Sequence, residues 1–241
     1  MALYAIADLH LSTNSVTNKS MEVFGNRWTG YTDKLINNWN RLVTDEDTVV
    51  LPGDISWALT LTEALCDFQF IAKLKGTKLI GKGNHDFWWA SLTKMNSFLA
   101  DNQIDNIKFL HNNAFAVDEY IICGTRGWFY DEKQSGIPEN TDYNKLVNRE
   151  VQRLALSLEA GERLSQKTGY PILVFLHFPP VWGNFVCKEI LDLLKNYRIK
   201  RCFFGHIHGG YDTPPAFNFE GIDFRLISAD HLNFTPLYIP R

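Results

Sequence analysis

Short apolar segments recur along the chain, and each one ends beside a residue that can bind a metal ion. The segments are four or five residues long and rich in β-branched or aromatic side chains, which is typical of buried strands. They are Leu3–Ala7, Thr48–Leu51, Lys78–Gly81, Ile172–Leu176 and Arg201–Phe204. Because sites in α/β sheets gather at the carboxyl ends of strands, the ends of these segments are expected to meet in one place.

Amphipathic segments lie between these strands. Apolar residues at helical spacing predict helices over Thr32–Val43, Thr60–Leu74, Phe87–Leu99, Lys145–Ser165 and Phe185–Tyr197. The alternation of strands and helices predicts an α/β fold built of layers. Two further segments, Phe115–Cys123 and Phe217–Ile239, have the pattern of antiparallel strands, so the sheets are expected to be mixed.

The composition indicates one globular domain that spans residues 1–241. Hydrophobic residues make up 45% of the chain and charged residues 21%, which excludes a disordered or collagen-like protein. The formal net charge of −3 gives no global basic surface for nucleic acid. A local basic groove is still possible, and the densest group of basic residues that could form it is Lys73, Lys75, Lys78 and Lys82.

The chain has no feature expected of a secreted or membrane protein. Its first residues lack a basic region and reach Asp8 almost at once, unlike a signal peptide. The longest uncharged stretch, Pro171–Cys187, is too short and too broken to span a bilayer. The four cysteines form no C-x-x-C pair and are expected to be reduced core or near-core thiols. We therefore expect a cytoplasmic protein without a membrane partner.

Two polar regions each have more than one interpretation. Leu11–Tyr31 is long and irregular and follows directly after Asp8 and His10, so it is either a roof over the site or a surface insertion. The helix predicted at Lys145–Ser165 carries mixed charges, among them Glu150 and Arg153, that are typical of a solvated face. This helix could cover the site or form a dimer contact.

Eight polar side chains at the segment ends are the candidate site residues. They are Asp8, His10, Asp54, Asn84, His85, His177, His206 and His208. Of the seven histidines, only His111 and His231 fall outside this set. Carboxylate, amide and imidazole donors suit Mn²⁺, Fe²⁺ and Zn²⁺, and the lack of a thiolate argues against a structural zinc site. The set is too large for one ion and sufficient for two, with Asp54 as the natural bridging carboxylate.

The residues beside the ligands fit sharp departures from strand ends. Asp8-x-His10 and His206-x-His208 alternate along extended segments, which places each pair on one face. Glycines precede several of the ligands and permit sharp turns. They are Gly53, Gly83 and Gly205.

Taken in order, these motifs resemble those of the calcineurin-like metallophosphoesterases. The motifs are Asp8-x-His10, Gly53-Asp54, Gly83-Asn84-His85-Asp86, an isolated His177 and Gly205-His206-x-His208. Five motifs in order, each in its strand context, make the resemblance specific, and they span most of the chain. The resemblance implies a four-layer αββα sandwich of two mixed sheets with a two-metal site.

The resemblance also implies a role for each site residue. One metal is assigned to Asp8, His10 and His208. The other is assigned to Asn84, His177 and His206, and Asp54 bridges the two. His85 faces the substrate as a proton donor or phosphate binder. In the mechanism that the resemblance implies, a metal-bound hydroxide attacks phosphorus in line. We expect the ions to be Mn²⁺, with Fe or Zn as the alternatives.

One departure from the family pattern concerns the second motif. Protein Ser/Thr phosphatases continue it with an acid and an arginine, where this chain has Trp57 and Ala58. The acid that orients His85 is therefore missing, which argues against a protein phosphatase. Asp86 is adjacent and could either substitute for that acid or cap the helix predicted from Phe87.

Four more residues have a functional and a structural interpretation. Trp88 and Trp89 could stack a nucleobase, although core packing is favoured. Arg126 could bind a phosphate or be a solvated turn residue, and His231 is favoured as a plain loop residue.

The predicted function is a metal-dependent phosphoric ester hydrolase that acts on a small phosphorylated molecule, either a phosphomonoester or a phosphodiester. A nuclease is the alternative among enzymes, and nucleic acid is not excluded as a partner. A non-catalytic scaffold with the same fold would be expected to lack ligands, and every motif ligand is present.

Overall fold

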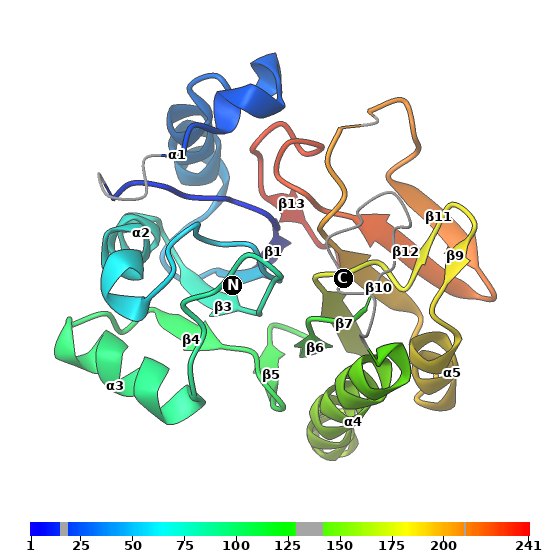
Figure 1. Ribbon diagram of the computed structural model, residues 1–241. Coiled ribbons are helices and arrows are strands. Elements are labelled where there is room, and N and C mark those ends of the chain that lie inside the picture. Colours follow the sequence, from blue (N-terminus) through cyan, green and yellow to red (C-terminus); the bar gives the residue numbers. More distant parts are fainter. Residues whose placement is uncertain (15–18, 129–141, 210) are drawn as a thin grey trace.

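The computed structural model describes residues 1–14, 19–128, 142–209 and 211–241, and its strands form two large sheets (Figure 1). Along the first sheet the order is β13 (Leu237–Tyr238), β1 (Leu3–Ala5), β2 (Thr48–Leu51), β3 (Thr77–Ile80) and β4 (Ile107–Phe109). Strands β1 to β4 are parallel, and β13 adds an antiparallel edge to β1. The first sheet is therefore mixed, as predicted.

The second sheet is also mixed. Its order is β11 (Ala216–Phe219), β12 (Ile222–Leu226), β10 (Arg201–Phe204), β7 (Ile172–Leu176), β6 (Tyr120–Thr125) and β5 (Ala114–Val117). The four inner strands are parallel, and the edge strands β5 and β11 are antiparallel to their neighbours. A separate small hairpin consists of β8 (Val181–Trp182) and β9 (Phe185–Val186).

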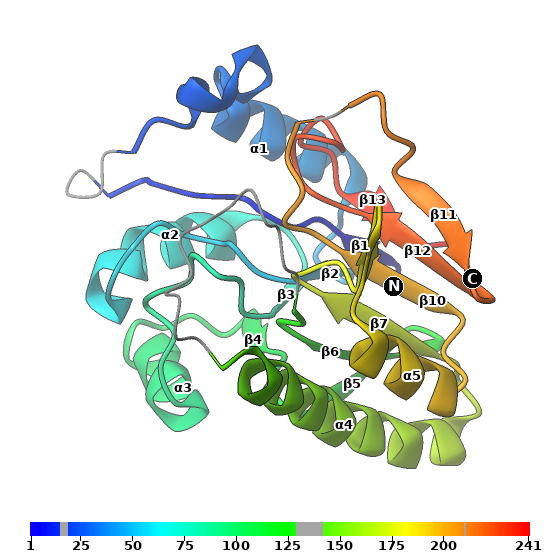
Figure 2. The ribbon, with the colours of Figure 1, turned by 45° about the vertical axis from the view of Figure 1, so that its right-hand side comes forward.

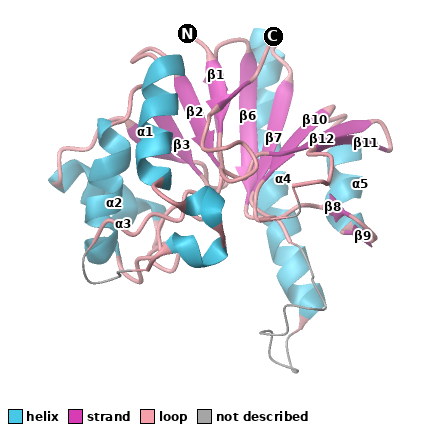
Figure 3. Cartoon of the chain, turned by 90° about the horizontal axis from the view of Figure 1, so that it is seen from above, coloured by secondary structure: helices cyan, strands magenta, loops and turns pink. Residues whose placement is uncertain are grey.

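Helices cover the outer face of each sheet, as Figure 3 shows from above. The first sheet is covered by α1 (Tyr31–Leu42), α2 (Leu61–Lys73) and α3 (Leu92–Asp101). The second sheet is covered by α4 (Tyr143–Thr168) and α5 (Lys188–Asn196). A third apolar cluster lies between the two sheets. The fold is therefore the four-layer αββα sandwich that the family resemblance implies.

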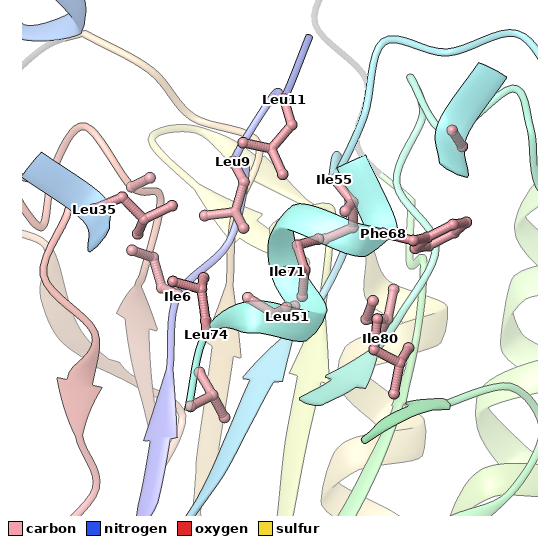
Figure 4. Packing of buried hydrophobic residues seen from close by; sticks show 14 of the residues in the cluster. Ile6, Leu9, Leu11, Leu35, Leu51, Ile55, Phe68, Ile71, Leu74 and Ile80 are labelled. Atoms are coloured by element: carbon pink, nitrogen blue, oxygen red, sulfur yellow. The ribbon is translucent and has the colours of Figure 1, made fainter. Parts of the chain in front are cut away.

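Alternation along the strands explains why both faces of each sheet are apolar. In β2, Val49 and Leu51 point toward the helices, while Val50 points toward the other sheet. Phe175 of β7 and Phe203 of β10 stack between the sheets with ring centroids 4.8 Å apart. Figure 4 shows the outer cluster, in which side chains of the first sheet pack against α1 and α2. The parallel strands of the first sheet are thus packed on both faces.

Two predicted helices begin later than the sequence pattern suggests. We predicted a helix from Phe87, but α3 starts at Leu92 and its N-cap is Ser91, whose hydroxyl accepts the amide of Lys94. The other was predicted from Phe185, yet that residue lies in β9, and α5 starts at Lys188. In both places apolar residues that precede the helix lie in a loop or a hairpin, so their spacing extended the helical pattern too far.

The terminal segments and the cysteines show further differences from the predictions. The segment Phe217–Ile239 forms the hairpin β11–β12 and the edge strand β13, while β12 is parallel to β10. Strand β4 was not predicted. Cys123, Cys187 and Cys202 are buried thiols as expected, but Cys66 is exposed. No described helix is long and apolar enough to cross a membrane.

Candidate metal centre

The predicted site residues come together where the parallel strands of both sheets end, in the loops that follow β1, β2, β3, β7 and β10 (Figure 2). Two groups of side chains could each hold one cation, because one ligand atom from every member lies within 4.8 Å of those of the others. The first group is Asp8, His10 and His208, and the second is Asp54, His177 and His206.

One carboxylate oxygen connects the two groups. Asp54 Oδ2 lies 3.5 Å from His177 Nε2 in the second group and 3.7 Å from His10 Nε2 in the first. Asn84 joins the second group, since its Oδ1 lies 2.6 Å from His177 Nε2. In the first group, His10 Nε2 and His208 Nε2 are 3.2 Å apart. This spacing places every predicted ligand around two neighbouring positions.

The backbone at these ligands adopts an uncommon conformation. Asp8, His10, Asp54 and His206 have φ values of 61°, 46°, 52° and 70°, in the left-handed region that L-residues rarely occupy. Such conformations cost about 1–3 kcal/mol each and concentrate at functional sites, where the surrounding structure holds them. The strain therefore sits at the ligands themselves, at the points where the chain leaves each strand.

Glycines act mainly by allowing close approach. A β-carbon at Gly83 would collide with the backbone and carboxylate of Asp54, and one at Gly205 would collide with the carboxylate of Asp8. Of the three motif glycines, only Gly53, with a φ of 115°, has the positive φ expected of a sharp turn. The glycine motifs thus bring neighbouring strand ends into contact as well as turning the chain.

The electrostatics of the centre fit positive ions. Asp8, Asp54 and Asp86 are each at most 1% exposed, and no lysine or arginine among the described residues pairs with them. Burial raises the pKa of Asp8 to about 6, and burial followed by the charges of Asp86 and Asp8 raises the pKa of Asp54 well above its ordinary value. Asp8 Oδ1 is buried without a hydrogen-bond partner. Divalent cations would supply the missing countercharge.

Two histidines of the centre, His10 and His177, are suited to act as neutral ligands. Burial lowers the pKa of His10 and of His177 well below the usual value, and their histidine neighbours lower it further. Metal ligation needs the neutral imidazole. Both rings also have a buried Nδ1 without a hydrogen-bond partner.

Asp86 supports the loops of the centre. It neither orients His85 nor caps the following helix, which are the two roles predicted for it. Its carboxylate accepts the backbone amides of Asp54, Ile55 and Gly83 at 2.7–2.9 Å, and also the indole N–H of Trp88. No contact with the ring of His85 is found, and Ser91 caps the helix instead. Asp86 therefore fixes two ligand loops relative to each other.

Asp230 is a functional candidate that the sequence analysis missed. Its carboxylate accepts a hydrogen bond from His208 Nδ1 at 3.0 Å, which leaves Nε2 of that ring facing His10. Gly209 N–H and Tyr211 O–H also donate to it. Although burial opposes charge on both groups, this pairing raises the pKa of His208 and lowers that of Asp230. Carboxylates that orient a ligating histidine in this way strengthen metal binding.

Replacing Asp230 with asparagine is expected to weaken Mn²⁺ binding by roughly 10–100-fold, because the amide cannot accept from all three donors and no longer fixes the histidine tautomer. Calorimetric titration of the metal-free variant with Mn²⁺ measures this loss. Asp223→Asn, an exposed position of the same segment, is the control. Unchanged affinity in Asp230→Asn would show that His208 needs no partner to bind metal.

His85 packs against Trp57 instead of an acid. The two ring centroids are 4.3 Å apart, and Lys19 Nζ lies 3.5 Å from the Trp57 ring centroid. Burial, and then the charge of Lys19, lowers the pKa of His85 to about 4. The backbone N–H of His85 donates to Asp54 Oδ1 at 2.8 Å. His85 is therefore held beside the ligands as a neutral ring.

The segment that follows His10 forms a roof over the site. It contains the short helices η1 (Met21–Phe24) and η2 (Asn26–Trp28). Met21, Phe24 and Trp28 line a pocket of about 230 Å³ together with Trp57 and site histidines. Tyr31 O–H donates to the carbonyl of His10 at 2.9 Å, which ties the roof to the ligand loop. Of the two interpretations of Leu11–Tyr31, the roof is the one that its described part fits.

Other residues singled out in the sequence have structural contacts. Trp88 is buried in the core and Trp89 packs against it, as favoured. His231 bonds the carbonyl of Gly209 through Nε2. Glu150 was expected on a solvated face, but it is fully buried. Arg126 is not a solvated turn residue, because it pairs with Glu150 at 3.3 Å.

Comparison with known proteins places this geometry in a family. Among curated proteins none matches the sequence. Similar solved structures include TT1561 of Thermus thermophilus, with 13% identity, a TM-score of 0.60, and coverage of 95% of this chain and 89% of that chain. Phosphopantetheinyl Hydrolase (PptH) from Mycobacterium tuberculosis is similar, with 14% identity, a TM-score of 0.54, and coverage of 94% and 88%.

At such identities these two structures are evidence for the fold alone. The sequence itself carries the family assignment, because the family model described as calcineurin-like phosphoesterase matches residues 1–210. The motifs, the sandwich and the two ligand groups agree with that match. The chain belongs to the calcineurin-like phosphoesterase family.

Proposed function

We propose that this chain is a dinuclear metal-dependent phosphoesterase that hydrolyses a phosphomonoester or phosphodiester of a small molecule. The observation that carries the proposal is the pair of ligand groups around Asp54 Oδ2, open to one pocket. Membership of a family whose proteins generally use two metals supports it. We assign one ion to Asp8, His10 and His208, and we assign the other to Asn84, His177 and His206, with Asp54 shared.

The chemistry divides between the ions and the protein. Two divalent cations held by these ligand groups would neutralise charge on the phosphoryl oxygens and would activate water for attack at phosphorus. The strained loops hold the ligands in place before substrate arrives, so little reorganisation is needed. The ring of His85 lines the same pocket and can donate a hydrogen bond to a phosphoryl or leaving oxygen. Trp28 and Trp57 flank the ligands and limit the entry of bulk water.

The size and lining of the pocket favour a small substrate. A roofed cavity of about 230 Å³ accepts a phosphoester group and a slender attachment, but no folded protein surface. Trp57 occupies space beside His85 at the position where protein phosphatases of this family carry an acid. Nuclease activity is the second candidate. Of the four lysines considered for a basic groove, Lys78 cannot contribute, because it is fully buried and bonds the carbonyls of Leu74 and Gly76.

Hydrolysis of p-nitrophenyl phosphate and of bis-p-nitrophenyl phosphate tests the proposal. Metal-free protein is expected to be inactive, and Mn²⁺ is expected to restore activity toward at least one ester, with Fe²⁺ and Zn²⁺ compared in parallel. Calorimetry should give two ions bound per chain. Two bound ions without hydrolysis of either ester would favour the non-catalytic scaffold, and efficient cleavage of single-stranded DNA or RNA would favour the nuclease.

A further inference from the structure

A second cavity, of about 130 Å³, opens beside the metal centre between the two sheets. It is lined by residues from the loops that follow β3 and β4, from the end of β6 and from α4, and three of its six polar residues are lysine or arginine. The charged and polar members are Lys82, His111, Thr125, Arg126, Glu150 and Arg153. None of them has a part in the two ligand groups.

The cavity has more positive than negative charge. Glu150 is its only carboxylate among the described lining residues, and that side chain is fully buried. Oε1 of Glu150 accepts from Arg153 at 2.6 Å and from Arg126 at 3.3 Å, while Oε2 accepts from Thr125 at 3.0 Å. One carboxylate thus accepts hydrogen bonds from two arginines, and Lys82 adds a third positively charged side chain.

Two donors in the cavity have no partner among the residues that the structure describes. Arg126 Nε is buried and has no hydrogen-bond partner. Lys82 makes no hydrogen bond or ion pair with any described residue, although its side chain is half-buried. A buried donor without a partner is destabilising, so an arrangement of this kind is typical of a site that binds an anion.

The cavity adjoins the second ligand group. Lys82 lies two residues before Asn84 in the same loop. The guanidinium carbon of Arg126 lies 5.9 Å from the ring centroid of Phe178, and the ring of Phe178 lies 4.5 Å from that of His206. Arg126 and His206 therefore both lie beside the ring of Phe178, so the cavity and the metal centre are close enough for one ligand to reach both.

We propose that this cavity is a subsite for a second anionic group of the substrate, a phosphate or a carboxylate, held by Lys82, Arg126 and Arg153. The inference rests on the proposed function, and it narrows the substrate class to small phosphoesters with a further negative charge. Glu150 positions the two arginines so that their outer N–H groups remain available, and Arg126 offers the planar donor fork that oxyanions match.

Binding of inorganic sulfate to metal-free protein tests the subsite without using catalysis. Without metal, the acidic centre repels anions, so calorimetry reports on the basic cavity. The double variant Lys82→Gln, Arg153→Gln is expected to weaken sulfate binding by about tenfold or more, since charged hydrogen bonds are removed. Arg163→Gln, exposed on the same helix, is the control. Circular dichroism confirms that the variants fold.

Kinetics with Mn²⁺ then test the substrate class. Alkanediol bisphosphates of two to six carbons are compared with p-nitrophenyl phosphate. We expect a bisphosphate of suitable length to have a lower KM, sulfate to compete with it, and the double variant to lower kcat/KM about tenfold for the bisphosphate alone. Equal losses for both substrates would overturn the proposal, and so would inhibition by sulfate of p-nitrophenyl phosphate hydrolysis to the same degree.

The two proposals fail in different ways. Hydrolysis of p-nitrophenyl phosphate without sulfate binding overturns the subsite and leaves the proposed function standing. Sulfate binding that the double variant loses supports an anion site in the cavity even if no ester is hydrolysed, and in that case it is the proposed function, with the substrate class built on it, that is overturned.

Discussion

Asp54→Asn is expected to abolish Mn²⁺-dependent hydrolysis while making the metal-free protein more stable. Both effects have one cause, the burial of Asp54 beside Asp8 and Asp86 without a basic partner among the described residues. Asparagine keeps the shape of the side chain and an oxygen for the N–H of His85. It loses the charge that two cations would share, so we expect kcat to fall by about 10³-fold or more.

The gain in stability depends on pH in a definite direction. Asp8 and Asp54 have raised pKa values in the folded metal-free protein, so the folded state binds more protons than the unfolded state. Stability of the metal-free wild type should therefore fall as pH rises from about 4, the ordinary carboxyl value, through the raised folded values, which for Asp8 means about 6. The variant has one such group fewer, and we expect roughly 0.5–2 kcal/mol of added stability at pH 7.

Urea denaturation with chelator and with saturating Mn²⁺ measures both parts of this prediction. Metal at 100 times its Kd should stabilise the wild type by about 2.7 kcal/mol per site and the variant much less. Asp105→Asn, at an exposed loop position, controls for a generic change of charge. A variant that binds Mn²⁺ like the wild type would show that Asp54 holds no cation.

The strands could be predicted because each one is marked by a local run of apolar residues. Continuous apolar runs such as Thr48–Leu51 identify strands that are buried on both faces and therefore predict a layered α/β fold, whereas the second sheet of the sandwich was implied by the family resemblance. The end of each run also locates a ligand. Strand β4 was missed because an exposed Lys108 separates its two buried residues, Ile107 and Phe109, so no apolar run marks it.

Interactions between distant segments could not be predicted from local patterns. Asp86 precedes apolar residues and so has the sequence signature of a helix cap. Its carboxylate instead accepts hydrogen bonds from the backbone amides of another loop. Asp230 follows the strand β12 closely, which is the same signal that identified the other site residues. The sequence pattern did not show where β12 ends within Phe217–Ile239, so Asp230 could not be recognised as a residue that follows a strand.

The charged helix α4 was misjudged for a related reason. Mixed charges at helical spacing usually face solvent, and Glu150 and Arg153 fit that pattern. Glu150 instead lies over the end of β6, where Thr125 and Arg126 supply its partners from a segment 24 or 25 residues earlier in the chain. Burial of a carboxylate is tolerated only with such partners, and sequence spacing does not reveal them.

His85→Ala is expected to reduce kcat by about 10²–10⁴-fold while leaving Mn²⁺ affinity close to that of the wild type. The His85 ring is not part of either ligand group, and only its backbone N–H contacts Asp54. Calorimetry and steady-state kinetics on the same preparations separate the two quantities. Equal losses of metal affinity in His85→Ala and Asp54→Asn would contradict the separate roles assigned to the two side chains.

A comparison of leaving groups distinguishes the two roles considered for His85. A proton donor matters most for alkyl phosphates, whose leaving alkoxide is strongly basic, and little for p-nitrophenyl phosphate. The His85 ring has no carboxylate partner among the described residues, it packs against the tilted ring of Trp57, and its pKa is lowered to about 4, so it is neutral at pH 7 and suited to hydrogen-bond the phosphoryl group. We therefore expect similar losses for both esters in His85→Ala, and partial recovery in His85→Gln, which retains an N–H donor. A much larger loss for the alkyl ester would establish His85 as the general acid instead.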